Sequence, residues 1–253
     1  MKTISIKNIE IGKGIPKICI PIVGNTMEEI IEQAKTIIQY PIDIVEWRAD
    51  WFENVFNTEV VIKVLKELAS VLNDIPLLFT FRTANEGGEK EIDIVTYNKL
   101  NQEVISSGYI DIVDVEMFIN DKVVHEIITH AHQHKVSVIA SNHDFNKTPN
   151  KNEIVQRLCK MQEMGADIAK IAVMPKTKKD VLTLLEATLE MYENHTSIPI
   201  VTMSMSEIGV ISRITGEVFG SAITFASVNK ASAPGQIEVK ELISALKIVH
   251  NYS

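Results

Sequence analysis

Eight short apolar runs, each followed by a longer polar or amphipathic segment, constrain the fold of this 253-residue chain more than any other feature. The runs are rich in Val, Ile, Leu and Phe, which is typical of strands buried on both faces in a parallel sheet. We therefore expect strands at residues 17–23, 42–48, 76–82, 109–116, 136–142, 166–173, 198–204 and 221–227.

The intervening segments show apolar residues at helical spacing. Thr26 opens one of them and is followed three residues later by Glu29, a spacing typical of a capping box. Eight strand–helix units favour the α/β class and a (β/α)8 TIM barrel. A doubly wound sheet is the alternative, but the first turn lacks the GxGxxG pattern. Helices are expected at residues 26–39, 58–72, 150–164, 179–192 and 239–249.

The first fourteen residues precede the first long run and alternate apolar with polar side chains. Isoleucines at positions 4, 6, 9 and 11 predict a short β-hairpin that closes the bottom of the barrel. We find no linker or repeat beyond the barrel unit, so residues 1–253 are expected to form a single barrel domain.

Charge and cysteine usage narrow the possible partners. The formal net charge of −8 disfavours a general binder of nucleic acid or of an anionic membrane. Cys19 and Cys159 lie far apart and are expected to be reduced thiols of a cytoplasmic protein. No secretory signal or membrane-spanning run is recognisable. We expect a small-molecule ligand, and because the chain is acidic overall, any anionic ligand must be held by a local cationic site.

Polar residues gather where the predicted strands end, which is where barrels of this class carry their active sites. Alternation along each strand places pairs of these residues on one face. The candidates at strand ends and in the loops after them are Glu46, Arg48, Asp50, Thr80, Arg82, Glu86, Ser141, Asn142, His143 and Asp144. Asp114, Glu116 and Lys170 are candidates carried by the strands themselves.

Only four arginines occur in the chain. Arg48 and Arg82 finish predicted strands, Arg213 follows the seventh strand, and Arg157 lies in mid-helix, where we expect a surface charge. A planar guanidinium suits a site that binds a carboxylate. The alternative for the first three is structural ion pairing, for example Arg48 with Glu46.

Lys170 lies in the middle of an apolar strand, where an unpaired ammonium is costly. Burial favours the free amine that imine formation requires. The alternative is a core ion pair with Asp114 or Glu116. His143 ends the neighbouring strand and could transfer protons, with Glu86 available to orient it.

The remaining histidines give little support for a metal. His130 and His134 could share a helical face, but no cysteine or carboxylate at suitable spacing completes a ligand set. We therefore expect neither a metal nor a cofactor.

Five segments with distinctive residues occur in order along the chain: Glu46-Trp-Arg-Ala-Asp50, Thr80-Phe-Arg82, Ser141-Asn-His-Asp-Phe145, Asp167-Ile-Ala-Lys170 and Ser232-Ala-Pro-Gly-Gln236. Together they resemble the type I 3-dehydroquinate dehydratases, also called 3-dehydroquinases. The resemblance covers the whole chain at matching length.

The resemblance implies a metal-free lyase of the shikimate pathway, usually a homodimer, that converts 3-dehydroquinate to 3-dehydroshikimate and water. It implies an imine on Lys170, with His143 as general base and then acid and Glu86 orienting it. The implied substrate contacts are a carboxylate site at Arg213, polar contacts from Glu46, Arg48 and Arg82, a closing loop with Ser232 and Gln236, and apolar walls from Met203, Met205 and Phe225.

Two other functions remain as alternatives. A class I aldolase is also a barrel with a lysine on strand six, but residues 227–236 contain only Gly235 and lack a glycine-rich phosphate cradle. A non-catalytic sensor of a pathway metabolite would not be expected to keep Lys170, His143 and Glu86 together.

Overall fold

Parallel strands form a closed ring in this computed structural model, which describes residues 3–228 and 233–252. Neighbours along the ring follow the sequence from β3 to β9, and β10 pairs with β3. The ring closes where the backbone N–H of Ala222 donates to the carbonyl of Ile200 at 2.8 Å. The strands of the ring are β3 (Lys17–Ile22), β4 (Ile44–Arg48), β5 (Leu77–Thr80), β6 (Ile112–Glu116), β7 (Ser137–Asp144), β8 (Ile168–Val173), β9 (Ile200–Ser204) and β10 (Ile223–Ser227).

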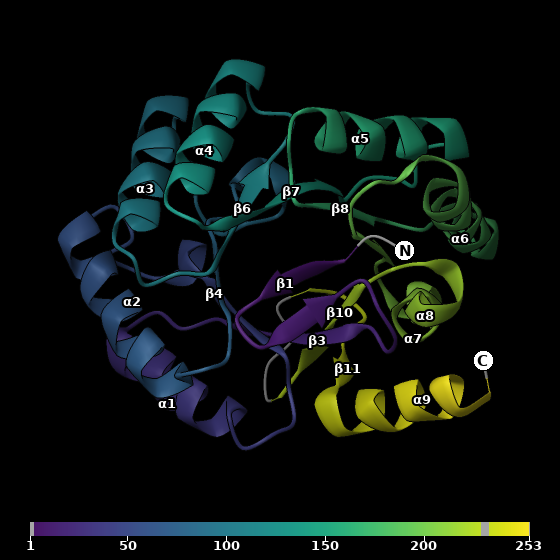
Figure 1. The fold of residues 1–253 in the computed structure, drawn as a ribbon, viewed down its shortest axis with the longest axis horizontal. Helices are drawn as coiled ribbons and strands as arrows, with labels where there is room; N and C mark the ends of the chain where they lie inside the picture. Colours follow the sequence, from purple (N-terminus) through teal and green to yellow (C-terminus); the bar gives the residue numbers. More distant parts are fainter. Residues whose placement is uncertain (1–2, 229–232, 253) are drawn as a thin grey trace.

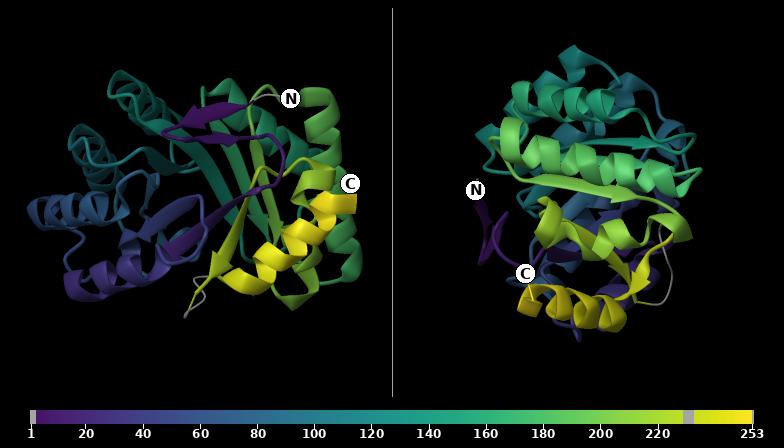
Figure 2. Two further views of the ribbon diagram at one scale, coloured as in Figure 1. Left: turned by 60° about the horizontal axis from the view of Figure 1, so that its bottom comes forward. Right: turned by 90° about the vertical axis from the view of Figure 1, so that its right-hand side faces the viewer.

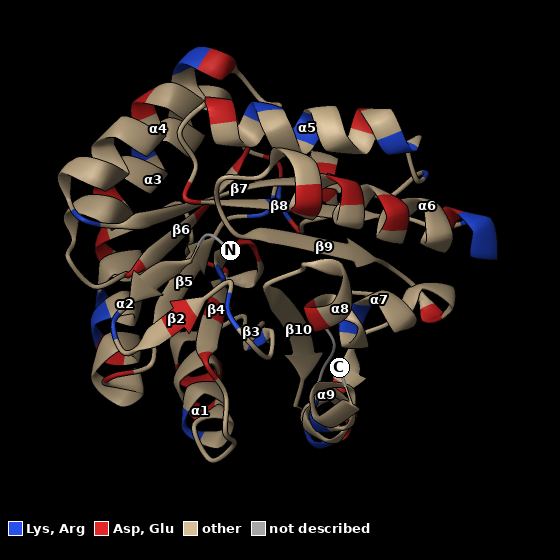
Figure 3. Ribbon diagram, turned by 45° about the vertical axis from the view of Figure 1, so that its right-hand side comes forward, with Lys and Arg blue, Asp and Glu red and all other residues tan. Residues whose placement is uncertain are grey.

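Helices surround the ring on its outside and run alongside the strands (Figures 1 and 2). Both acidic and basic residues occur along these outer helices, as Figure 3 shows for α4, α5 and α6. No helix in the described ranges is long and apolar enough to cross a bilayer. The helices are α1 (Met27–Ile37), α2 (Thr58–Leu72), α3 (Ile94–Ser106), α4 (Asp121–Gln133), α5 (Lys151–Glu163), α6 (Lys178–Glu190), α7 (Ile211–Ile214), α8 (Gly216–Phe219) and α9 (Val239–Tyr252).

The predicted barrel is confirmed, and each predicted strand lies within about three residues of an observed one. The eighth unit continues past β10 into a two-residue strand, β11 (Ile237–Glu238), which pairs with it. After β9 the chain forms the short helices α7 and α8, where the other units have a long one. The capping box at α1 is partly confirmed: Thr26 Oγ1 accepts from Glu29 N, but the Glu29 carboxylate bonds to Asn25 N.

The helix ranges predicted from the sequence omit α3 and α4. On α3 a polar residue interrupts the inward face. Asn101 is fully buried on that face and donates from Nδ2 to the carbonyl of Tyr97, one turn earlier. A side-chain amide that bonds to its own helix can be buried without a tertiary partner for that group. The inward face of this helix is therefore buried, although its sequence does not show a continuous apolar pattern.

Two apolar layers hold the barrel together. One lies between the sheet and the helices. The other fills the ring interior near the amino ends of the strands, with Ile44, Leu78 and Ile112 among its members. The predicted hairpin, β1 (Ile4–Ile6) and β2 (Ile9–Ile11), packs Ile6 and Ile11 against this inner layer. It lies across the opening of the ring in Figure 1 and closes that end.

We expect replacement of Ile11 by alanine to destabilise the barrel, because this side chain is fully buried in the inner layer. A cavity of that kind costs about 2–5 kcal/mol of unfolding free energy, measurable by urea denaturation. Glu10→Ala, at the exposed neighbouring position, is the control and should change stability by less than about 0.5 kcal/mol. Equal stabilities of the two variants would show that the hairpin does not support the core.

Candidate active site

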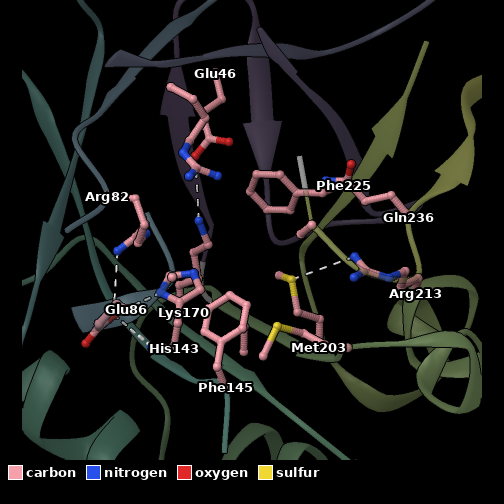
Figure 4. Close-up of a pocket in the computed structure, with 15 residues that line it drawn as sticks. Glu46, Arg82, Glu86, His143, Phe145, Lys170, Met203, Arg213, Phe225 and Gln236 are labelled. Atoms are coloured by element: carbon pink, nitrogen blue, oxygen red, sulfur yellow. Dashed lines mark hydrogen bonds and ion pairs between the residues drawn. The ribbon is translucent and has the colours of Figure 1, made fainter. Parts of the chain in front are cut away.

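The inner face of the barrel changes from apolar to polar along the strands. Parallel register sets Ser141 beside Lys170, and Thr80 beside Asp114, one layer above the apolar floor. A pocket opens above them at the carboxyl ends of the strands (Figure 4). Its lining residues are Glu46, Arg48, Arg82, Glu86, Gly87, His143, Phe145, Lys170, Ala172, Met203, Met205, Arg213, Phe225, Ala233 and Gln236.

This lining includes each described residue to which the family resemblance assigns a role. The other candidates on the strands and at their ends lie outside it: Asp50, Thr80, Asp114, Glu116, Ser141, Asn142 and Asp144. Ser232, the remaining predicted residue, lies outside the described ranges. Phe145, Ala172 and Gly87 were not singled out as site residues from the sequence, because apolar and small side chains carry no chemical signal there.

Lys170 is 3% exposed and extends from β8 toward two carboxylates. Its Nζ lies 3.2 Å from Asp114 Oδ2 and 3.8 Å from Glu46 Oε1. The same nitrogen is 4.5 Å from the centre of the Phe225 ring. The ion pair with Asp114 is one that the sequence analysis left open. Opposite charges and an aromatic face hold the amine at the floor of the pocket.

Arg82 is buried and ties the carboxylates of β6 together. It donates from Nη2 to Asp114 at 2.8 Å and from Nη1 to Glu116 at 3.0 Å. Burial alone would lower the pKa of Arg82, but the charges of Asp114 and Glu116 outweigh it and raise that pKa. For Asp114, burial raises the pKa, yet Arg82 and Lys170 lower it overall. Both groups therefore stay ionised, and Glu116 is bonded to Arg82 rather than to Lys170.

Arg48 is also paired within the protein. Its Nε and Nη2 each donate to an oxygen of Asp50 at 2.8 Å, in the bidentate geometry typical of arginine and carboxylate. Burial lowers the pKa of Arg48, but the bond and charge of Asp50 raise it overall. The ion-pair partner is thus Asp50, not Glu46, which instead accepts a bond from Thr80.

His143 and Glu86 form a bonded pair at the mouth of β7. Nδ1 of His143 is 3.0 Å from Glu86 Oε2, and the backbone N–H of His143 donates to the same oxygen at 2.8 Å. Burial lowers the pKa of His143 well below its usual value, and the charges of Arg82 and Lys170 lower it further. Burial raises the pKa of Glu86 to about 7, partly opposed by Arg82.

A tight turn brings Glu86 to the histidine. Glu86 ends the 3-10 turn η2 (Ala84–Glu86), and Gly87 follows with φ of +83°. A Cβ at Gly87 would lie 2.3 Å from the Phe145 ring, so only glycine fits between the turn and the residues after β7.

Arg213 differs from the other two arginines of the pocket. It is 2% exposed on α7, and it contacts the carbonyl of Pro234 at 3.0 Å and Met203 Sδ at 3.8 Å. Its Nε has no hydrogen-bond partner, and no carboxylate within the described ranges pairs with it. Burial lowers the pKa of Arg213 to about 10. It extends into the pocket from the side opposite Arg82 and Glu86 (Figure 4).

The segment after the undescribed residues 229–232 covers this side of the pocket. Gly235 has φ of +76°, and a Cβ there would lie 2.3 Å from the carbonyl oxygen of Ser206. This close approach brings Ala233 and Gln236 into the lining.

Arg157, which was expected to be a surface charge, is half-buried and paired. Its side chain is 21% exposed, and it donates from Nη1 to Asn142 Oδ1 at 2.8 Å. The contact joins the middle of α5 to an outward-facing residue of β7, and helical periodicity alone does not reveal such a pairing. For the histidines of α4, the rings of His130 and His134 are 4.3 Å apart, but no group of three metal-ligating side chains occurs among the described residues.

Comparisons with known proteins agree with this geometry. The family model for type I 3-dehydroquinase matches residues 18–253. The 3-dehydroquinate dehydratase of Clostridioides difficile is 55% identical over 249 residues, 98% of each chain. That of Salmonella agona is 52% identical over 250 residues, 99% of each chain.

Solved structures give the same result. The type I 3-dehydroquinate dehydratase of Clostridium difficile, described as carrying covalently modified comenic acid, superposes with a TM-score of 0.98 over all of both chains. The 3-dehydroquinate dehydratase of Geobacillus kaustophilus, 37% identical, has a TM-score of 0.97 and covers 100% of this chain and 98% of its own. The chain therefore belongs to the type I 3-dehydroquinase family, whose members are hydro-lyases that dehydrate 3-dehydroquinate to 3-dehydroshikimate in the shikimate pathway.

Proposed function

We propose that this chain dehydrates 3-dehydroquinate through an imine on Lys170, with His143 as general base and then general acid. The observation that carries the proposal is the shared pocket, which a buried amine and an oriented imidazole line together. An ionised carboxylate only accepts hydrogen bonds, so Glu86 fixes the proton of His143 on Nδ1. The lone pair on Nε2 is then free to take a proton from the substrate.

The chemistry follows from these positions. The Lys170 amine attacks the substrate ketone, and loss of water leaves a protonated imine that acidifies the adjacent carbon. His143 removes a proton there and gives an enamine. The enamine expels the β-hydroxyl, which His143 protonates as it leaves as water. Hydrolysis of the imine then releases 3-dehydroshikimate and restores the amine.

Asp114 and Glu46 support the charged states of this sequence. They lie 3.2 and 3.8 Å from Lys170 Nζ. A protonated imine carries its positive charge at the same nitrogen as the ammonium, so the two carboxylates can stabilise either species.

Arg213 is proposed to bind the substrate carboxylate. Arg48 and Arg82 are already bonded to protein carboxylates, whereas Arg213 is buried with an unpaired Nε. A buried cation without an anionic partner is costly, and an arriving carboxylate would relieve that cost.

The remaining residues of the pocket are proposed to shape it around the ring of the substrate. Glu46, Arg48 and Arg82 would contact hydroxyls and the reacting end, while Ser232 and Gln236 would belong to a closing loop. Apolar walls would come from Met203, Met205 and Phe225, which lie among the inner-layer residues near the pocket.

We also propose that residues 1–253 act as a single-domain barrel, as a homodimer, in the cytoplasm, with a small-molecule substrate and no nucleic-acid or membrane partner. Family membership supports the biosynthetic setting. The net charge of −8 supports the choice of a small-molecule ligand over polyanions.

Borohydride reduction in the presence of 3-dehydroquinate is expected to leave a covalent adduct on Lys170, because hydride addition converts the imine to a secondary amine that cannot hydrolyse. Peptide mass spectrometry would locate it. Lys170→Met should give no adduct and should lower kcat/KM by about 10⁴-fold or more. An adduct on a different lysine, or turnover retained in the variant, would contradict the assignment.

Arg213→Met is expected to raise KM by about tenfold to a hundredfold, because a charge-assisted bond to the substrate is lost. A substrate analogue lacking the carboxylate makes the test specific. Wild-type protein should bind the analogue weakly, and the variant should bind it no more weakly than wild type does. If the variant loses as much affinity for the analogue as for the substrate, Arg213 acts elsewhere.

Activity is expected to fall as the pH drops below about 7, the value to which burial raises the pKa of Glu86. Protonation of Glu86 removes the ionised acceptor that fixes the tautomer of His143, so kcat/KM measured from pH 5 to 9 should show an acidic limb. Glu86→Gln should lower kcat/KM and abolish that limb. Retention of the same limb in the variant would assign it to a different group.

A further inference from the structure

A chain of hydrogen bonds runs from an outer helix into the catalytic pair. Arg157 on α5 donates from Nη1 to Asn142 Oδ1 at 2.8 Å. Asn142 in turn donates from Nδ2 to Glu86 Oε1 at 2.9 Å. Glu86 uses its other oxygen for His143. The route connects a helix on the outside of the barrel with the imidazole through three side chains.

The guanidinium of Arg157 and the carboxylate of Glu86 fix the direction of the two bonds to Asn142. A guanidinium has five N–H donors and no acceptor, so the Asn142 amide must present its oxygen to Arg157. Its NH₂ group then faces Glu86 and donates. Without Arg157 the amide could turn over and present its oxygen to the carboxylate, which would repel it.

Arg157 is itself held in place from several sides. Its Nη2 bonds to Glu153, one turn earlier on α5, and Nη1 lies 3.8 Å from Asp144 Oδ2. Its guanidinium also lies 5.9 Å from the centre of the Phe118 ring. These contacts leave a preorganised donor beneath Asn142, which is 8% exposed.

We propose that Arg157 is a positioning residue for the Glu86–His143 pair and that it acts through the orientation of the Asn142 amide. The inference rests on the proposed role of His143 as the base. Arg157 is not among the residues that line the pocket, so its effect on catalysis would be transmitted through the bond to Asn142.

The bond from Asn142 also affects the pH at which Glu86 is protonated. Glu86 is faced by Arg82 from the end of β5, by Glu116 from β6, and by Asn142 and His143 from β7. Burial is the main cause that raises the pKa of Glu86, Glu116 adds to it, and Arg82 and the Asn142 bond oppose it. Loss of the oriented Asn142 donor should therefore leave Glu86 protonated at higher pH.

Arg157→Met tests this directly. It keeps the length of the side chain and removes the donor. We expect kcat/KM at pH 6 to fall about twofold to tenfold, with little change at pH 9 and little change in KM. Arg157→Lys should restore much of the profile, because lysine also donates and cannot accept.

Lys160→Met is the matched control. Lys160 lies one turn later on the same helix and over the same Phe118 ring, but it bonds to Asp121 instead of Asn142. Lys160→Met removes an equal charge from the same helix, so the pH profile of this variant should match that of wild type. A shift equal to that of Arg157→Met would show a general charge effect and overturn the proposal.

Asn142→Asp changes the bond to Glu86 and leaves Arg157 in place. This test remains available if Arg157→Met does not fold. An aspartate keeps the shape and the bond to Arg157, but it cannot donate to Glu86 and adds a like charge beside it. The acidic limb should move to higher pH. An unchanged limb in both variants, or a loss of activity equal at every pH, would overturn the proposal.

The same samples separate this inference from the proposed function. Borohydride trapping on Lys170 should succeed in wild type and in all four variants. If trapping on Lys170 fails in wild type, the imine mechanism itself is wrong. If trapping succeeds and the pH profiles coincide, only the role of Arg157 is wrong.

Discussion

The buried ion-pair network inside the barrel is the interaction on which the site depends. Lys170 and Arg82 share Asp114, and each has a further carboxylate partner, Glu46 or Glu116. Removal of one member would leave an uncompensated charge in a dry interior, which is strongly destabilising. The network therefore fixes the reactive amine at one position while the apolar layer below it excludes water.

The three arginines of the pocket differ in their charge partners, although their side chains are chemically identical. Arg48 and Arg82 are neutralised by protein carboxylates and stiffen the wall of the pocket. Arg213 has no carboxylate partner in the part of the chain that the structure describes, which is why it is proposed to bind a ligand that brings its own anion. Charge balance, more than residue type, separates a structural arginine from one that suits a substrate carboxylate.

The strands could be predicted from the sequence because burial on both faces leaves short, continuous apolar runs. The polar residues of these strands and the loops after them then identified the charged part of the pocket lining, whereas Met203, Phe225 and Gln236 were indicated only by the resemblance to a known family. Contacts between elements could not be predicted in this way. Asp50 as the partner of Arg48, and the reach of Arg157 to Asn142, depend on side-chain directions that periodicity does not encode. The buried Asn101 of α3 was missed because its bond stays within one helix.

The hairpin of β1 and β2 also determines where water can enter and leave the barrel. Its isoleucines and the apolar layer above them close one end of the ring, so exchange with solvent takes place at the carboxyl ends of the strands. In the proposed cycle, imine formation and elimination each release one water, and hydrolysis consumes one. Water that is not reused in place therefore has to cross the carboxyl ends of the strands, where Ala233 and Gln236 belong to the lining of the pocket.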